Sequence, residues 1–176
     1  MAGHSKWKQI KEKKGKTDAK RSQIFARYAK LITNEARAAK GNKDAPSLRA
    51  AIERARKENM PSDNIERAIK KATEAGGAAL ESILYEAYGP GGVALLIEVL
   101  TDSRNRTAGE IKPQLSENGG NLASPGAAVW AFTKGPEGWV ATTTAPLEDA
   151  DLERLDKLVE VLEGNEDVQE VITNAE

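Results

Sequence analysis

Residue types that support enzyme chemistry are scarce in this chain of 176 residues. It has no cysteine, which excludes disulfides and thiolate chemistry, and its single histidine is His4. No cluster of His, Cys and Asp has the spacing of metal ligands. We therefore expect no catalytic residue, no metal and no cofactor, and we predict that the protein is not an enzyme.

Long apolar segments are missing as well. No run of apolar residues approaches the roughly 18 residues of a membrane-spanning helix, and the N-terminus lacks the apolar core of a secretory signal. Hydrophobic residues make up 39% of the chain and charged residues 30%, which is typical of a soluble protein with much charged surface. We expect a cytoplasmic protein that binds neither a membrane nor a small-molecule substrate.

The net charge of −1 conceals an uneven distribution of charge. Residues 1–77 hold 20 Lys/Arg and 9 Asp/Glu, a net charge of +11, whereas residues 78–176 hold 6 and 18, a net charge of −12. The basic part favours binding of a polyanion, and nucleic acid is the polyanion with the densest regular charge. The acidic part could contact the basic part, a protein partner or only water.

The first thirty residues carry the strongest basic signal, because only Glu12 and Asp18 oppose it. Trp7 adds a flat face that can stack on a base or a ribose, and a histidine in such a segment favours phosphate or base contacts. The alternative is a solvated basic arm without a ligand. The candidate nucleic-acid-binding residues here are His4, Lys6, Trp7, Lys8, Lys11, Lys13, Lys14, Lys16, Lys20, Arg21 and Arg27.

The periodicity of residues 17–77 predicts three short helices, whereas residues 1–16 lack a helical period and are expected to form an arm. Apolar residues between positions 24 and 36 recur every three or four residues, and Thr17 or Asp18 can cap this helix. Pro46 favours the start of a second helix, and Ser62 or Asp63 can cap a third. Since many inward positions are alanine, we expect a three-helix basic domain with a thin core over residues 1–77.

From residue 78 the pattern changes to short apolar runs and alternation, which favours strands. The predicted order from residue 93 is strand, helix, strand, strand, helix, strand, over residues 93–100, 103–115, 129–132, 139–142, 147–162 and 168–173. This order is that of a ferredoxin-like βαββαβ fold, with residues 84–88 as an extra strand before it. We therefore predict an α+β protein whose acidic ferredoxin-like domain spans residues 78–176.

Two arginines stand out in the acidic part. Arg104 and Arg106 lie at the expected N-terminus of a helix, where backbone N–H groups favour anions, so we include both among the nucleic-acid-binding candidates. Salt bridges to neighbouring acidic residues are an equally good interpretation. Residues 89–92, in contrast, lack the Gly-Lys-Ser/Thr ending of a phosphate loop and indicate a turn.

Six short motifs occur in order along the chain: Gly3-His4-Ser5-Lys6-Trp7, Asp18-Ala19-Lys20-Arg21, Asn59-Met60-Pro61 with residues 63–69, Tyr88-Gly89-Pro90-Gly91-Gly92, Asn105-Arg106-Thr107 and Asn118-Gly119-Gly120-Asn121-Leu122. Together they resemble the YebC/PmpR family. The resemblance implies a helical domain and a ferredoxin-like domain in a transcriptional regulator that binds promoter DNA. It extends to translation factors that act on ribosomes stalled at proline-rich stretches, and to a mitochondrial translational activator of cytochrome c oxidase. Only residues 141–147 occupy the place of the family's usual third domain, so this is a compact version.

These observations support a non-enzymatic regulator that binds nucleic acid through its basic N-terminal domain. The family description favours DNA and transcription. No helix with base-reading side chains is evident, however, and this favours structured ribosomal RNA and the ribosome as the alternative target. A second alternative is a protein-interaction module that uses the acidic domain.

Overall fold

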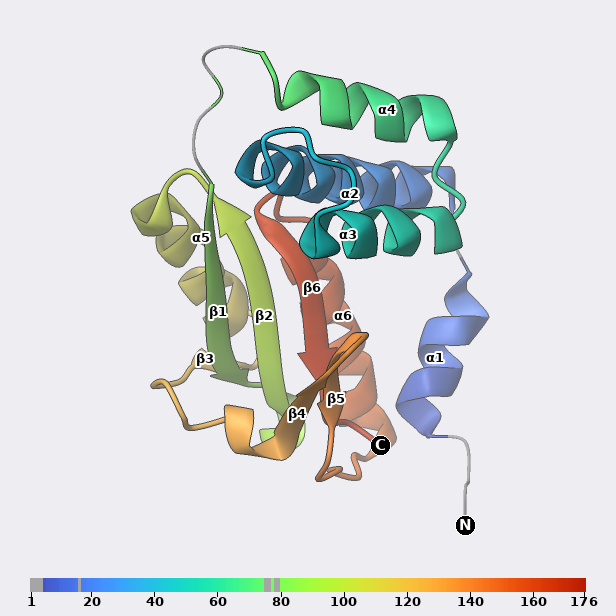
Figure 1. Ribbon diagram of the computed structural model, residues 1–176. Coiled ribbons are helices and arrows are strands. Elements are labelled where there is room, and N and C mark those ends of the chain that lie inside the picture. Colours follow the sequence, from blue (N-terminus) through green and yellow to red (C-terminus); the bar gives the residue numbers. More distant parts are fainter. Residues whose placement is uncertain (1–4, 16, 75–76, 78–79) are drawn as a thin grey trace. The chain divides into compact units, whose positions relative to one another are not determined.

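The chain divides into two compact units in the computed structural model, which describes residues 5–15, 17–74, 77 and 80–176 (Figure 1). One unit is helical and spans residues 16–80, and the other combines residues 1–15 with residues 81–176. This division differs from the expected domains 1–77 and 78–176, because the first helix packs within the second unit. The two units are therefore described one at a time.

The helical unit consists of three helices, as the periodicity predicts. α2 packs against both α3 and α4. Thr17 caps α2, because its side-chain oxygen accepts a hydrogen bond from the amide of Lys20 at 3.2 Å. The core is built from small and medium side chains, with Ile32 and Leu48 fully buried. The helices are α2 (Asp18–Ala38), α3 (Pro46–Lys57) and α4 (Ser62–Lys71).

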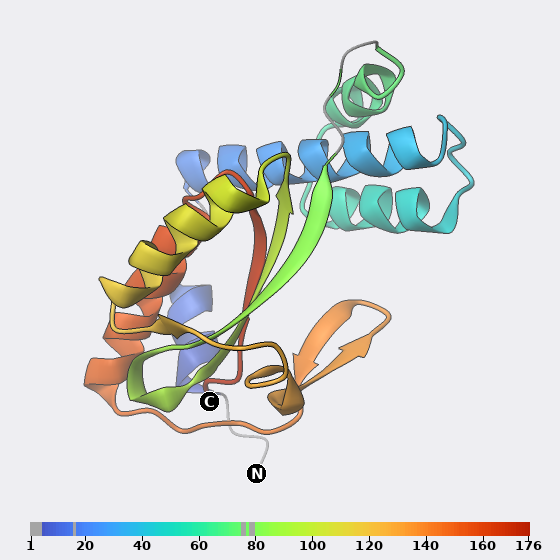
Figure 2. The same ribbon diagram turned by 90° about the vertical axis from the view of Figure 1, so that its left-hand side faces the viewer.

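The second unit is built on an antiparallel sheet of four strands in the order β3-β1-β2-β6. Figure 2 shows α5 and α6 on one face of this sheet and the β4–β5 hairpin on the opposite face. The strands are β1 (Glu81–Tyr88), β2 (Ala94–Thr101), β3 (Asn121–Leu122), β4 (Phe132–Gly135), β5 (Gly138–Ala141) and β6 (Val168–Thr173), and the helices are α5 (Arg104–Ser116) and α6 (Asp149–Glu163).

The second unit has the predicted α+β class but not the predicted ferredoxin-like order. Among the described residues, strands β4 and β5 pair with each other and not with the main sheet, and β1, expected as an extra strand, pairs with β2 along its whole length. The strand expected over 129–132 is wrong for 129–131, which form the 3₁₀ helix η2 (Val129–Ala131). Strands β4 and β5 have four residues each, too few to take the place of the eight-residue strand β1 in the main sheet.

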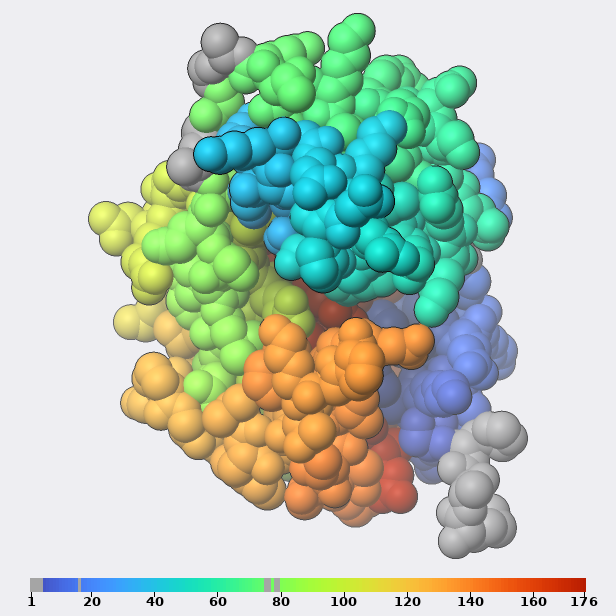
Figure 3. Space-filling view, viewed as in Figure 1, coloured from blue at the N-terminus to red at the C-terminus, as the bar shows by residue number. Residues whose placement is uncertain are grey.

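Strand β2 is buried on both faces, which explains its continuous apolar run. Leu95, Ile97 and Val99 pack against the helices, in the same cluster as Leu155 and Leu158. Leu96 points the other way, into a second cluster near the hairpin. The hairpin region, orange in Figure 3, lies at the surface, with Trp130 58% and Val140 59% exposed.

Residues 6–14 form helix α1 (Lys6–Lys14), so the expectation of an arm without helix is wrong for this stretch. Ser5 caps the helix by accepting a hydrogen bond from the amide of Lys8 at 3.0 Å. Trp7 packs against the core that the sheet shares with α5 and α6. Helix α1 is therefore a part of the α/β unit.

Candidate nucleic-acid interface

Helix α1 turns three of its five lysines toward the acidic helix α6. The Nζ of Lys6 lies 3.0 Å from Asp149 Oδ1, and that of Lys11 lies 3.6 Å from Glu163 Oε1. Lys14 donates to Glu160 Oε1 at 2.6 Å and also pairs with Asp156. These lysines, three of the predicted phosphate ligands, are bound to carboxylates of the same chain.

Asp156 is the centre of this contact. It is only 8% exposed, and Lys11 and Lys14 both pair with it. Hydrogen bonds from Lys14 to Asp156 and Glu160 raise the pKa of Lys14 above its usual value, so this ammonium group stays charged. The Nζ of Lys11 also lies 5.3 Å from the ring centre of Trp7, within the range of a cation–π contact. The arrangement thus holds α1 through both charge and apolar packing.

The remaining α1 lysines, Lys8 and Lys13, are exposed. Within the described residues neither forms an ion pair with a carboxylate. They are therefore the α1 cations best placed to meet a phosphate. His4 and Lys16, which also belong to the predicted set, lie outside the described residues.

Helix α2 carries the other N-terminal candidates. Lys20 and Arg27 are half-buried, and Arg21 is exposed with its Nη1 at 3.3 Å from Asp18 Oδ1. Residues 16–80 contain 15 Lys/Arg and 8 Asp/Glu, a net charge of +7, whereas residues 1–15 with 81–176 have a net charge of −8. When α1 is assigned to the unit against which it packs, the excess of positive charge therefore lies in the helical unit.

Arg104 and Arg106 both form ion pairs with carboxylates of the same unit. Arg104 binds Glu81 through two hydrogen bonds, of 2.9 and 3.2 Å, and this pairing raises the pKa of Arg104. Arg106 donates to Asp167 at 2.9 Å and pairs with Asp102 at 2.9 Å. The salt-bridge interpretation thus describes their contacts, although both guanidinium groups remain partly exposed.

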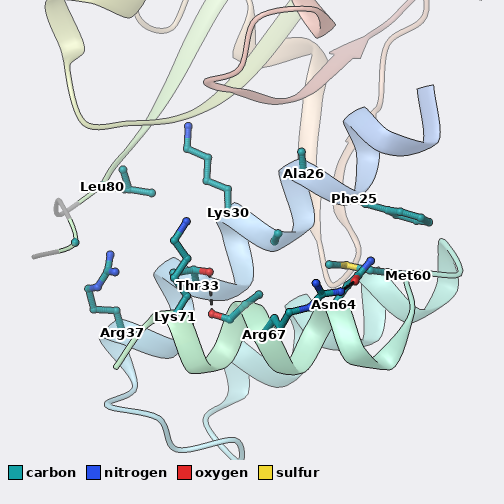
Figure 4. Close-up of a pocket in the computed structure, with 13 residues that line it drawn as sticks. Phe25, Ala26, Lys30, Thr33, Arg37, Met60, Asn64, Arg67, Lys71 and Leu80 are labelled. Carbon is teal, nitrogen blue, oxygen red and sulfur yellow. Dashed lines mark hydrogen bonds between the residues drawn. The ribbon is translucent and has the colours of Figure 1, made fainter. Parts of the chain in front are cut away.

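A pocket lies between α2 and α4, and sequence reasoning did not single it out. Its volume is about 650 Å³. Four of its lining side chains are cationic, and among the described lining residues there is no Asp or Glu. Figure 4 shows Lys30, Arg37 and Lys71 at one end and Phe25 and Met60 at the other. Met60 belongs to a motif that we used only for the family resemblance, so its place in a pocket could not be foreseen.

Two further features concern the described part of the chain. None of the helices there has the length and apolar character needed to cross a membrane. In the same residues, no three His, Cys, Asp or Glu side chains are grouped so that they could hold a metal ion.

Comparison with known proteins places the chain in a family. Residues 5–75 match the TACO1/YebC protein N-terminal domain, and residues 80–136 match the TACO1/YebC second and third domain. These matches cover more than half of the sequence. The chain therefore belongs to the TACO1/YebC family, as the motifs indicated.

Several relatives are named "Probable transcriptional regulatory protein". One from Halothermothrix orenii is 47% identical over 96% of this chain, and one from Treponema pallidum is 53% identical over 76% of it. The chain spans 66% of the first relative's length and 56% of the second's. A crystal structure of a conserved hypothetical protein from Aquifex aeolicus is 29% identical, with a TM-score of 0.76 over 90% of this chain and 91% of that one. The names of the relatives indicate a regulatory role at the level of the family.

Proposed function

We propose that this protein is a non-enzymatic transcriptional regulator that binds DNA through its basic N-terminal part. The observation that carries this proposal is the concentration of positive charge in the helical unit, with 15 basic and 8 acidic residues. Counterion release from a phosphate backbone makes such a surface bind nucleic acid in a salt-dependent manner. The names of the relatives supply the link to transcription.

The unit in which each cation lies refines which residues take part. Lys20, Arg21 and Arg27 lie on α2, in the basic unit, and are the first candidates for phosphate binding. Lys8 and Lys13 add two exposed cations from α1. Lys6, Lys11 and Lys14 contribute less, because a phosphate must compete with the carboxylates of α6 for them.

The test is fluorescence anisotropy with a labelled DNA duplex at several salt concentrations. The variant replaces Lys20, Arg21 and Arg27 with alanine. We expect weaker binding and a salt slope reduced by about 1 for each phosphate that the variant no longer neutralises. The matched control replaces three exposed lysines of the α/β unit with alanine and should bind like the wild type; its sites are Lys112, Lys134 and Lys157.

A comparison of several nucleic-acid probes distinguishes a transcriptional regulator from a translation factor. A promoter duplex should bind more tightly than a scrambled duplex of equal length if the protein regulates transcription by sequence. Equal affinity for the two, together with tighter binding to ribosomal RNA, would support the translation-factor alternative instead. If no salt-dependent binding to any of these probes is measured, the proposal fails.

A further inference from the structure

The pocket between α2 and α4 has two chemically different ends. At one end the side chains of Lys30, Arg37 and Lys71 gather (Figure 4). At the other end lie the ring of Phe25 and the thioether of Met60, both of which pack with the helical core. The pocket thus has a cationic end and an end where apolar side chains lie beside the hydrogen-bonded pair of Arg67 and Asn64.

The hydrogen bonds of the polar lining residues leave the cations as its main polar groups. Thr33 donates to the backbone oxygen of Ala68 at 2.9 Å, which ties α2 to α4 across the pocket floor. Asn64 accepts a hydrogen bond from Arg67 through its side-chain oxygen. The side-chain oxygens of Thr33 and Asn64 are therefore held by bonds within the helical unit. A ligand would meet mainly positive charge and apolar surface.

A nucleotide matches this division of chemistry. Its phosphate carries a negative charge that the cationic end can attract, and its base has flat apolar faces that stack on aromatic or apolar side chains. A volume of about 650 Å³ falls within the range of pockets that hold a small organic ligand. A base paired within a duplex is stacked on both faces and cannot enter such a pocket, whereas an unpaired base can.

We propose that this pocket binds one unpaired nucleotide of a single-stranded DNA segment, with the base near Phe25 and Met60 and the phosphate near Lys30 and Lys71. This inference rests on the proposed DNA binding and adds that the helical unit prefers unpaired over paired DNA. The pocket is then the part of the helical unit that distinguishes unpaired from paired DNA.

The first measurement compares affinities for a labelled oligodeoxythymidylate and for the same strand annealed to its complement. We expect the single strand to bind more tightly. Lys71→Ala should weaken single-strand binding roughly fivefold, corresponding to about 1 kcal/mol for one phosphate contact. Lys70→Ala, also exposed on α4 but outside the pocket, is the matched control and should change binding much less.

A second variant tests the apolar end without changing any charge. Ala26 is exposed and lines the pocket, so Ala26→Leu fills part of the space while keeping a good helix former in α2. We expect it to weaken single-strand binding several-fold and to leave duplex binding unchanged. Thermal unfolding followed by circular dichroism confirms that each variant remains folded.

A third measurement observes the pocket directly. The chain has two methionines, Met1 and Met60, so the ¹³C-labelled methyl resonance of Met60 is assigned by a single Met60→Leu control. A base beside the sulfur should shift this resonance with the oligodeoxythymidylate and not with the duplex.

The outcomes separate this inference from the proposed function. Equal effects of the Lys71 and Lys70 variants, with an unmoved Met60 methyl resonance, would overturn the pocket inference while DNA binding stood. Tighter binding of the matching oligouridylate, with the same variant effects, would support the pocket and overturn DNA as its ligand. Absence of binding to every probe would overturn both.

Discussion

Replacing Glu86 with glutamine is expected to destabilise the α/β unit, because the carboxylate of Glu86 holds the loop before the hairpin. Glu86 lies in β1 and is 8% exposed. Its Oε2 accepts from the amide of Gly126 at 2.7 Å, and its Oε1 accepts from the amides of Ala128 at 3.0 Å and Val129 at 2.7 Å. A glutamine side chain presents one oxygen and one NH₂ group, so at least one of these amides loses its acceptor.

The expected loss of stability follows from the number of hydrogen bonds that Glu86 accepts and from the burial of its side chain. Hydrogen bonds to a charged group contribute about 1.5–3 kcal/mol each, and an amide left without an acceptor costs about 1–3 kcal/mol. Removing a buried charge relieves part of the desolvation cost, which offsets some of this loss. We therefore expect Glu86→Gln to lower the free energy of unfolding by about 2 kcal/mol, measured by urea denaturation at pH 7.

The dependence on pH provides a second test of the same contact. Burial alone would raise the pKa of Glu86, but the hydrogen bonds from the amides of Gly126, Val129 and Ala128 outweigh it, so the pKa lies below its usual value. The stabilisation is therefore fully present above the unfolded pKa of 4.5 and is lost as the pH falls through the lower folded pKa. The wild type should lose more stability on acidification than Glu86→Gln. Equal acid sensitivity of the two proteins, or a change below about 0.5 kcal/mol at pH 7, would refute this reasoning.

Two further predictions concern the other charged contacts of the α/β unit. Asp156→Asn should release α1 by removing the carboxylate that pairs with Lys14, at a cost of about 1 kcal/mol, and amide exchange of residues 6–14 should become faster. Glu153→Gln, an exposed position on the same helix, is the control, and similar exchange rates in both variants would contradict the role of Asp156. Thr107→Val removes the hydroxyl that donates to the buried Asp167 at 2.8 Å, and thermal or urea unfolding should show a loss of about 1–3 kcal/mol. An unchanged midpoint would show that this bond is dispensable.

The helices of the basic unit could be predicted because their signals are local. The apolar period, the Thr17 cap and Pro46 at the first turn of α3 all lie within the segments that they organise. Helix α1 could not be predicted in this way, since its binding partners are distant in sequence. Lys6 pairs with a residue 143 positions later, and Trp7 is held by the core of the α/β unit.

The apolar runs of the sequence predict where most strands lie, but they do not predict which strands pair. The sequence pattern does not show which strand lies beside which, because pairing depends on contacts between distant segments. The order of the strands alone predicts a hairpin within the main sheet, whereas the hairpin forms a separate sheet of two strands. The buried Glu86, which fastens the preceding loop to β1, was not recognised as a structural residue.

The charge distribution of the sequence overstates the surface that is available to a nucleic acid. Five lysines of α1 add to the basic part when the chain is divided at residue 77, but α1 belongs to the α/β unit, and three of the five are bound to carboxylates of α6. Deleting residues 1–15 would therefore remove Trp7 from a core and strip Asp156 of its partners, besides removing cations. Weaker binding after such a deletion could reflect a disrupted fold. Substitution of Lys8 and Lys13, which are exposed, changes the charge alone and isolates the contribution of α1 to binding.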